Sequence, residues 1–231
     1  MARFYIISLD PAQLNDYSAL SVIEAKDTKY RLEWLRRKQG LPYTEIVNWS
    51  KKVFLNPLFR KDVTYPPVFV LDIGGVGKAL QDMLTAAGVS TTGIQYTGGA
   101  TVTRESGNYH VSKSFIVGKF LAAWDEGRVQ MPAGASFLDM FQTELKAFRG
   151  EMTSQGRAKF EAEQGEHDDL VMCVAQAVWW CEHAAPKPIG PLVFSGATKE
   201  SCIVSGGATK RFTGIPSWVS PEYRRKHPHE F

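Results

Sequence analysis

The sequence is poor in the features that mark several common classes of protein. It has only three cysteines and no CxxC pair, so neither a disulfide framework nor a zinc knuckle is expected. No run of about eighteen apolar residues is present to span a bilayer. The N-terminus lacks the basic, apolar and small-residue zones of a signal peptide. These absences predict a protein that stays in the cytoplasm and has no membrane partner.

The chain also carries little excess charge. Its 27 lysines and arginines and its 24 aspartates and glutamates leave a formal net charge of +3, with an isoelectric point near 8.7. This mildly basic balance permits a nucleic-acid partner without requiring one. At 231 residues the chain can bury a core, as one large domain or as a domain with an appendage.

Two glycine-rich nucleotide motifs are absent as well. Gly74-Gly75-Val76-Gly77-Lys78 follows an apolar run, but a phosphate-binding loop needs the pattern G-x-x-x-x-G-K-[ST]. Asp72 and Ala79 stand where that pattern has its first glycine and its hydroxyl residue, and Leu80 replaces the third glycine of a dinucleotide fingerprint. We therefore interpret these glycines as a tight strand-to-helix turn that keeps space clear above Asp72.

What the sequence does contain is an alternation of strand-like and helix-like segments. Strands are predicted at about residues 4–10, 18–25, 28–35, 68–72, 91–96, 101–104, 109–111 and 128–131, and helices at 42–54, 78–87, 112–126 and 137–148. This order predicts an α/β fold with a mixed central β-sheet flanked by helices. Residues 1–185 would form this domain. Residues 186–231 are a Pro/Gly-rich basic tail, predicted to pack loosely or to be partly disordered.

The segment from Gly165 to Trp180 opens with polar residues and continues as an apolar helix. Its apolar residues recur at steps of three and four, which predicts one broad buried face. Asp168 and Asp169 then lie in the first turn of this helix. Acidic residues there often only satisfy free amide groups and complement the helix dipole, so a purely structural role is one interpretation.

Two other aspartates, Asp10 and Asp72, stand at the ends of predicted core strands. In a mixed sheet these two can lie side by side, with Asp168 and Asp169 brought over them by the late helix. Clustered carboxylates repel one another without a cation. Hard oxygen ligands with no histidine or cysteine cluster fit Mg²⁺ or Mn²⁺ better than zinc. Two such ions about 4 Å apart can activate a water and stabilise the leaving oxygen of a phosphodiester.

Four further residues are candidates for auxiliary roles. His167 directly precedes the aspartate pair, where a histidine is more often a cap or packing residue than a catalytic one. Arg104, Lys113 and Arg128 lie on the predicted hairpin and around the helix that follows it. There they can contact DNA phosphates without reading the sequence. The alternative is that these three basic residues are merely solvated.

Together these motifs resemble the nuclease domain of the large terminase subunit of tailed bacteriophages. The resemblance spans about residues 4–180 and is carried by Asp10 with Asp16-Tyr17-Ser18-Ala19, Val70-Leu71-Asp72 with Gly75-Val76-Gly77, Val111-Ser112-Lys113 with Glu126-Gly127-Arg128-Val129, and Gly165-Glu166-His167-Asp168-Asp169-Leu170-Val171-Met172. It implies a ribonuclease H-like fold related to Holliday-junction resolvases. It also implies that Asp10, Asp72 and Asp168 are acidic metal ligands. Asp169 would be an adjacent ligand or support.

For function, the resemblance implies a Mg²⁺- or Mn²⁺-dependent endonuclease that cuts double-stranded DNA during phage packaging, in the cytoplasm of the bacterial host. The implied partners are DNA, an ATPase motor and, through the motor, the portal and the small terminase subunit. Full terminase subunits place the motor before the nuclease, whereas this sequence has no Walker motif. An excised domain or a separately encoded nuclease would each explain the difference.

Three other functions stay open from the sequence. A Holliday-junction-resolvase-like nuclease would share the fold and the acidic cluster. A sugar-kinase-like or actin-like ATPase would use strand-end aspartates and glycine turns to hold nucleotide phosphates, and ATP binding would reveal it. A non-catalytic DNA-binding or packaging-assembly module would show no metal-dependent cleavage.

Overall fold

The computed structural model describes residues 3–12, 16–98, 101–132, 135–147, 151–152, 158–159 and 168–185. Its centre is an eight-stranded mixed sheet with the strand order β6-β7-β5-β4-β1-β2-β3-β8. The predicted tail of residues 186–231 lies outside the described residues, so the division of the chain at residue 185 stays a prediction. Within the described residues, no helix is both long enough and apolar enough to span a bilayer.

One half of the sheet is an antiparallel meander. β1 (Arg3–Asp10) pairs with β2 (Tyr17–Lys26), and β2 pairs with β3 (Lys29–Gln39). β1 and β2 are buried almost throughout because helices cover both of their faces, which explains their continuous apolar runs. β3 continues beyond the predicted end at residue 35, because its basic last residues keep pairing with the start of β2.

The other half of the sheet is largely parallel. β4 (Val68–Asp72) lies parallel to β1, β5 (Thr92–Thr97) to β4, and β7 (Asn108–Ser112) to β5. The two outer strands are β6 (Thr103–Glu105), antiparallel to β7, and β8 (Val129–Gln130), parallel to β3. Every predicted strand is present. The carboxyl ends of β1 and β4 meet at one edge of the sheet, because parallel strands run in the same direction.

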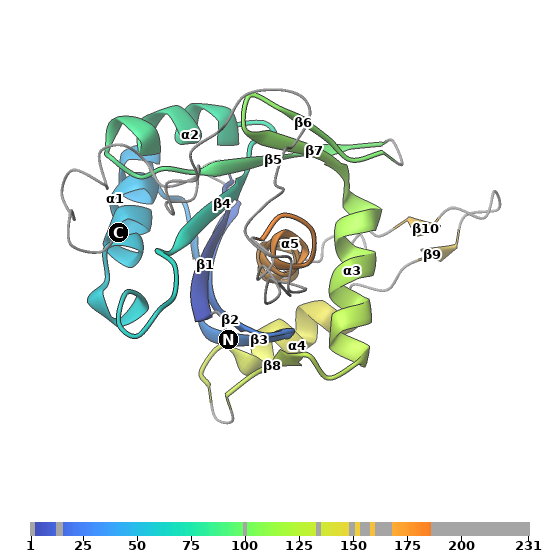
Figure 1. The fold of residues 1–231 in the computed structure, drawn as a ribbon. Helices are drawn as coiled ribbons and strands as arrows, with labels where there is room; N and C mark the ends of the chain where they lie inside the picture. Colours follow the sequence, from blue (N-terminus) through green and yellow to red (C-terminus); the bar gives the residue numbers. More distant parts are fainter. Residues whose placement is uncertain are drawn as a thin grey trace, which may run out of the picture. The chain divides into compact units, whose positions relative to one another are not determined.

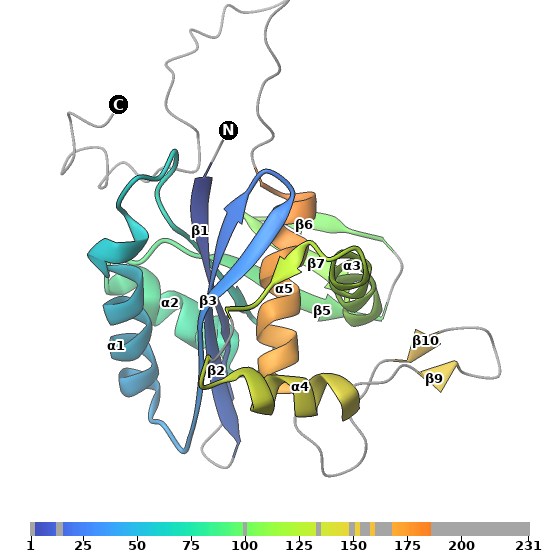
Figure 2. The same ribbon diagram turned by 90° about the horizontal axis from the view of Figure 1, so that it is seen from below.

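Helices cover both faces of the sheet (Figures 1 and 2). α1 (Tyr43–Phe54) and α2 (Gly77–Ala86) pack on one face, while α3 (Lys113–Asp125), α4 (Leu138–Ala147) and α5 (Asp169–His183) pack on the other. Shorter elements are the 3₁₀ helix η1 (Pro57–Phe59) and a separate ladder of β9 (Glu151–Met152) with β10 (Ala158–Lys159). The predicted mixed sheet flanked by helices is confirmed.

The burial of α5 corrects the prediction of a single apolar face. All residues from Leu170 to Trp180 are buried. The reason is visible in Figure 1, where α5 runs through the middle of the fold between the sheet and α3, with α4 beneath it. A helix that is enclosed on all sides is apolar on all sides. Asp168 and Asp169 therefore begin an enclosed helix, whereas His167 lies outside the described residues.

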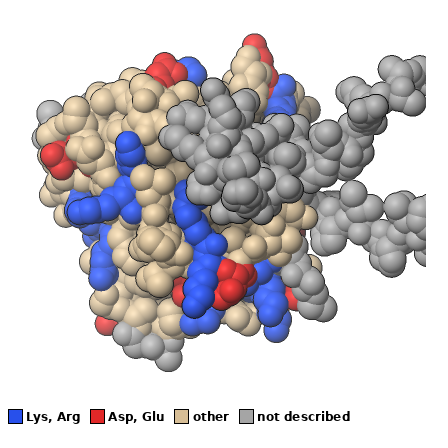
Figure 3. Space-filling view, turned by 60° about the vertical axis from the view of Figure 1, so that its left-hand side comes forward, with Lys and Arg blue, Asp and Glu red and all other residues tan. Residues whose placement is uncertain are grey.

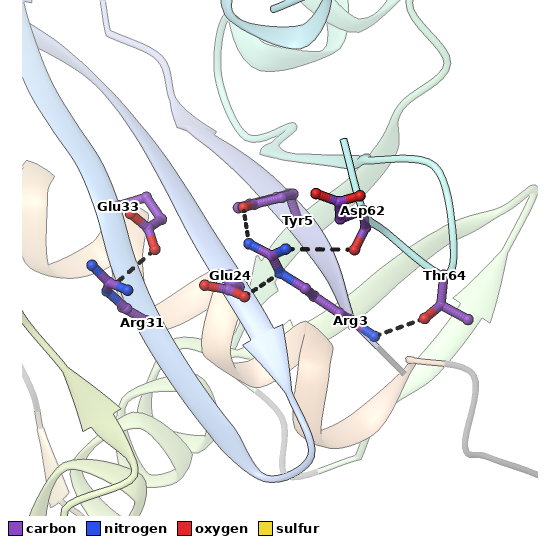
Figure 4. Close-up of polar contacts among 7 residues, drawn as sticks. All are labelled: Arg3, Tyr5, Glu24, Arg31, Glu33, Asp62 and Thr64. Carbon is purple, nitrogen blue, oxygen red and sulfur yellow. Dashed lines mark hydrogen bonds and ion pairs between the residues drawn. The ribbon is translucent and has the colours of Figure 1, made fainter. Parts of the chain in front are cut away.

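A polar cluster fixes the amino-terminal end of β1 (Figure 4). The Arg3 guanidinium binds the carboxylate of Glu24 on β2, and it also donates to the Tyr5 hydroxyl at 2.9 Å. The Arg3 backbone N–H donates to Thr64 Oγ1 at 3.0 Å, in the segment that leads into β4. These contacts tie β2, β1 and the approach to β4 together. They help to set the register of the two strands, which brings the carboxyl ends of β1 and β4 side by side.

Candidate active site

Strand alternation places Asp10 and Asp72 on the face of the sheet that α5 covers. Along β1, Ile6 packs in the core shared with α3 and α5, whereas Ile7 packs in the core shared with α1 and α2. Neighbouring side chains point to opposite faces, so Asp10, an even number of residues after Ile6, lies on the α5 side. Asp72 lies on the same face, because it comes two residues after Val70, which also packs in the core shared with α5.

The turn after β4 keeps the backbone close to the Asp72 carboxylate. The Gly74 N–H donates to Asp72 Oδ1 at 2.7 Å. A side chain at Gly74 would bring a Cβ within 3.1 Å of that oxygen, and one at Gly77 would bring a Cβ within 1.9 Å of the Asp72 carbonyl oxygen. Only glycine fits at Gly77, and a side chain at Gly74 would crowd the carboxylate. The interpretation of this segment as a tight turn is confirmed.

Asp168 does not act as an ordinary helix cap for α5. Asp168 occupies the N-cap position, but its side chain accepts no capping hydrogen bond. Its carboxylate instead accepts a hydrogen bond from Lys113 Nζ at 2.6 Å. Asp169 follows as the first helical residue, and its Oδ2 atom is buried. Asp168 therefore binds a cationic side chain, which a capping role does not explain.

The four aspartates and Lys113 form one electrostatic cluster. Burial raises the pKa of Asp10 well above its usual range, and the charges of Asp72, Asp169 and Asp168 raise it further. Burial also raises the pKa of Asp72, against the lowering effects of the Gly74 amide and of Lys113. The structure thus brings together carboxylates that are far apart in sequence, as the sequence predicts. Lys113 supplies a positive charge within the cluster.

The chemistry of the cluster suits a hard divalent cation. All of the donors are carboxylate oxygens, and a bound cation would relieve the repulsion that raises the pKa of Asp10. Among the described residues, however, no three histidine, cysteine, aspartate or glutamate side chains converge closely enough to hold one ion. In this conformation Asp168 is bound to Lys113.

Two buried polar side chains of α5 hold the end of β1, and the sequence analysis missed both. Gln176 Nε2 donates to the Leu9 carbonyl at 2.8 Å, and Gln176 Oε1 accepts from the Tyr96 hydroxyl at 3.2 Å. Cys173 Sγ contacts the Ser8 carbonyl at 3.0 Å. These bonds fix the backbone directly before the strand-end aspartate. A glutamine inside an apolar helix is the sequence signal that could have identified this role.

The three basic residues predicted to contact DNA have different surroundings. Lys113 lies in the acidic cluster, at the start of α3. Arg104 is exposed on β6, with its guanidinium 5.1 Å from the centre of the Tyr109 ring. Arg128 binds the carboxylates of Glu126 and Glu182, so its charge is already paired within the protein. Contact of these residues with DNA stays a prediction.

Comparison with known proteins matches the family model described as the terminase RNaseH-like domain over residues 7–178. The large terminase subunits of Thermus phage G20c and Thermus virus P23-45 are each 28% identical over 175 residues, which make up 76% of this chain and 31% of theirs. The chain therefore spans about a third of the length of these curated relatives.

Solved structures agree with this match. The large terminase nuclease from thermophilic phage G20c, solved with bound magnesium, is 25% identical, with a TM-score of 0.56 over 77% of this chain and 81% of that chain. The Thermus phage P74-26 large terminase nuclease domain shares the fold at 23% identity, with a TM-score of 0.57 over 79% of this chain and 82% of that one. The predicted ribonuclease H-like fold is confirmed, and the chain belongs to the terminase RNaseH-like domain family.

Proposed function

We propose that this chain is the nuclease of a phage DNA-packaging machine and cuts double-stranded DNA with the help of Mg²⁺ or Mn²⁺. The observation that carries the proposal is the carboxylate cluster of Asp10, Asp72, Asp168 and Asp169 in a chain of the terminase family. The related G20c nuclease has been solved with bound magnesium and with bound cobalt, which supports divalent cations as the cofactor class. The proposed partners are DNA and the packaging motor, with its portal and small terminase subunit.

In this proposal Asp10, Asp72 and Asp168 hold the metal, and Asp169 is a further ligand or a support. Bound divalent cations would supply activation of water and stabilisation of the leaving oxygen. The protein holds its carboxylates on rigid elements. Asp10 ends a strand whose last carbonyls are bound by α5, and Asp72 is fixed by the Gly74 amide. Asp10 and Asp72 are therefore held before DNA binds, whereas Asp168 is bound to Lys113 and would exchange that partner for a cation.

Cleavage of supercoiled plasmid tests the proposal directly. Purified protein is expected to nick and linearise plasmid in Mg²⁺ or Mn²⁺ without ATP, because the acidic cluster needs a cation and the reaction needs no motor. Excess chelator should abolish cutting, and activity that persists in chelator would contradict the metal mechanism. A four-way junction added as competitor separates the resolvase-like alternative, which predicts preferential cutting of the junction. ATP binding would favour the ATPase alternative.

The exposed Arg104 provides a test of the DNA path. Arg104→Ala is expected to weaken binding of unrelated duplex sequences equally and to reduce the slope of log affinity against log salt by about 1, because a phosphate contact releases counterions. Fluorescence anisotropy in chelator at several salt concentrations measures both quantities without cleavage.

The matched control for this test is Arg60→Ala. Arg60 also lies over an aromatic ring, 5.0 Å from the centre of Phe54, but its neighbour Phe59 packs on Tyr5 near the amino end of β1, away from the strand ends that carry Asp10 and Asp72. The face that carries α1 is itself rich in lysine and arginine (Figure 3), so this control asks whether loss of any basic side chain has the same effect. Equal salt slopes for the two variants would move the DNA path away from β6.

A further inference from the structure

A backbone amide in the first turn of α5 is bound by a residue from another helix. Glu144 of α4 accepts a hydrogen bond from the Leu170 N–H at 2.9 Å through its Oε2 atom. A helix N-terminus carries free N–H groups and a partial positive charge, both of which a carboxylate satisfies. Asp168, which stands in the capping position, makes no such bond. The carboxylate of Asp168 is thereby left available for Lys113 or for a cation.

Glu144 is itself held by an arginine from the sheet. Its Oε1 atom accepts from Arg37 Nη1 of β3 at 2.5 Å, and only 5% of the Glu144 side chain is exposed. Arg37 in turn lies over the Tyr17 ring at the start of β2, 4.3 Å from its centre. Burial raises the pKa of Glu144 to about 7, against the lowering effects of Arg37 and the Leu170 amide. A buried carboxylate of this kind is costly unless its partners are fixed.

Arg37 lies in the same row of the sheet as Asp10. Asp10 of β1 is paired with Ala19 of β2, and Ala19 is paired with Arg37 of β3. Paired residues of neighbouring strands point to the same face, so both Asp10 and Arg37 face α5. The chain of contacts Arg37–Glu144–Leu170 therefore connects the row that contains Asp10 to the helix turn that contains Asp168 and Asp169.

We propose that Glu144, held by Arg37, is a positioning residue that sets the first turn of α5 over the strand-end aspartates. This inference rests on the proposed function, because it concerns the geometry of the same carboxylates. Glu144 touches the backbone of α5 and no reacting group in this arrangement. Its role is to fix the distance between the helix-borne and the strand-borne carboxylates, and so to determine how tightly they bind a divalent cation.

The opposite end of α5 offers a matched control. Glu182 near the carboxyl end of the helix binds Arg128 and accepts a hydrogen bond from the Tyr30 hydroxyl at 2.5 Å. It is also a partly buried glutamate that joins α5 to an arginine and to the sheet. Because this contact lies at the far end of the helix from the aspartates, its loss should lower stability without changing the carboxylate geometry.

The experiment measures Mn²⁺ affinity by calorimetry and the melting temperature in chelator, for the wild type and for Glu144→Ala, Glu144→Gln and Glu182→Ala. Glu144→Ala is expected to weaken Mn²⁺ binding about 10- to 100-fold, as loss of a residue that orients a metal ligand does. Glu144→Gln keeps an oxygen for the Leu170 N–H and should recover most of this affinity. Glu182→Ala should melt at a lower temperature but bind Mn²⁺ like the wild type.

Each outcome separates positioning from plain stability. Mn²⁺ affinity that is unchanged in Glu144→Ala, or reduced equally in Glu182→Ala, would overturn the proposal. If Glu144→Ala does not fold, Arg37→Gln takes its place, because it removes the charge that holds Glu144, and wild-type Mn²⁺ affinity in Arg37→Gln would overturn the proposal. A wild-type protein that binds no Mn²⁺ would instead refute the proposed function itself, and the positioning role with it.

Discussion

Replacing Asp72 with asparagine is expected to lower plasmid cleavage about a hundredfold to a thousandfold, because a metal site contributes several kcal/mol of transition-state stabilisation. Asparagine keeps the shape of the side chain and an oxygen that can accept the Gly74 N–H, a bond of 2.7 Å in the wild type. What the substitution removes is the negative charge. A loss of cleavage would therefore report on the charge and not on the turn.

Without metal, the stability of the same variant should change little, and any change should be an increase, although cleavage falls. Burial raises the pKa of Asp72, and the Asp72 charge raises the pKa of Asp10, so ionised carboxylates oppose folding at neutral pH. Removing one of these charges is expected to leave the metal-free protein as stable as the wild type or slightly more stable. Mn²⁺ at a hundred times its dissociation constant should stabilise the wild type by about 2.7 kcal/mol and the variant much less.

Melting temperatures in chelator and in millimolar Mn²⁺, measured with the plasmid assay, test both parts of this prediction. Asp82→Asn on α2 is the matched control, since the Asp82 side chain is 71% exposed and lies outside the cluster. The control should melt, bind metal and cut DNA like the wild type. Equal Mn²⁺-induced shifts in Asp72→Asn and wild type, with cleavage retained, would remove Asp72 from the metal site.

The second large effect is expected at Lys113, where metal binding and cleavage should change in opposite directions. Lys113→Met removes the ammonium group that lies 2.6 Å from Asp168 Oδ2. A cation and the ammonium group compete for that carboxylate, so Mn²⁺ affinity should rise about tenfold, or ~1.4 kcal/mol. Cleavage should nevertheless fall. We propose that the Lys113 ammonium group contacts DNA phosphate when a cation takes its place at Asp168, and the variant lacks this group.

The metal-free stability of Lys113→Met should fall by about 1 kcal/mol, since the ion pair is partly exposed and solvent screens it. Lys78→Met is the control, because Lys78 pairs with Asp82 at 3.4 Å on the exposed side of α2. Calorimetric titration with Mn²⁺ and anisotropy with duplex DNA give the two affinities separately. Mn²⁺ binding that is weakened or unchanged in Lys113→Met would show that Lys113 does not compete with the metal.

Strand positions and strand-end aspartates were predictable because they depend on local sequence. The apolar run before Asp10 and the one before Asp72 each have strand length and end in a carboxylate. The glycines after Asp72 likewise indicate a turn, since Gly75 has a φ of +51°, a conformation that glycine adopts without steric cost, and Gly77 lies too close to the Asp72 carbonyl for any side chain. These features led to the expectation of an acidic cluster, which the structure places at one edge of the sheet.

Features that depend on the packing of distant segments were not predictable in the same way. Lys113 was expected to be a DNA contact, yet it binds Asp168, a partner 55 residues away in the chain. No role was predicted for Glu144, although it lies three positions after the buried Phe141 and interrupts the apolar face of its helix. That interruption is the signal that could have identified it, but its partners on β3 and α5 follow only from the fold.

The enclosure of α5 determines when the protein can complete its folding during synthesis. The sheet leaves the ribosome first, but the contact between Cys173 and Ser8 joins residues 165 positions apart, and it cannot form until α5 has emerged. Until then, apolar side chains such as Ile6 and Val70 lack their cover. The helix that completes the core also carries Asp168 and Asp169. A nascent chain therefore acquires its full set of carboxylates only when its core closes, and under the proposed function a partly made protein would lack a complete metal site.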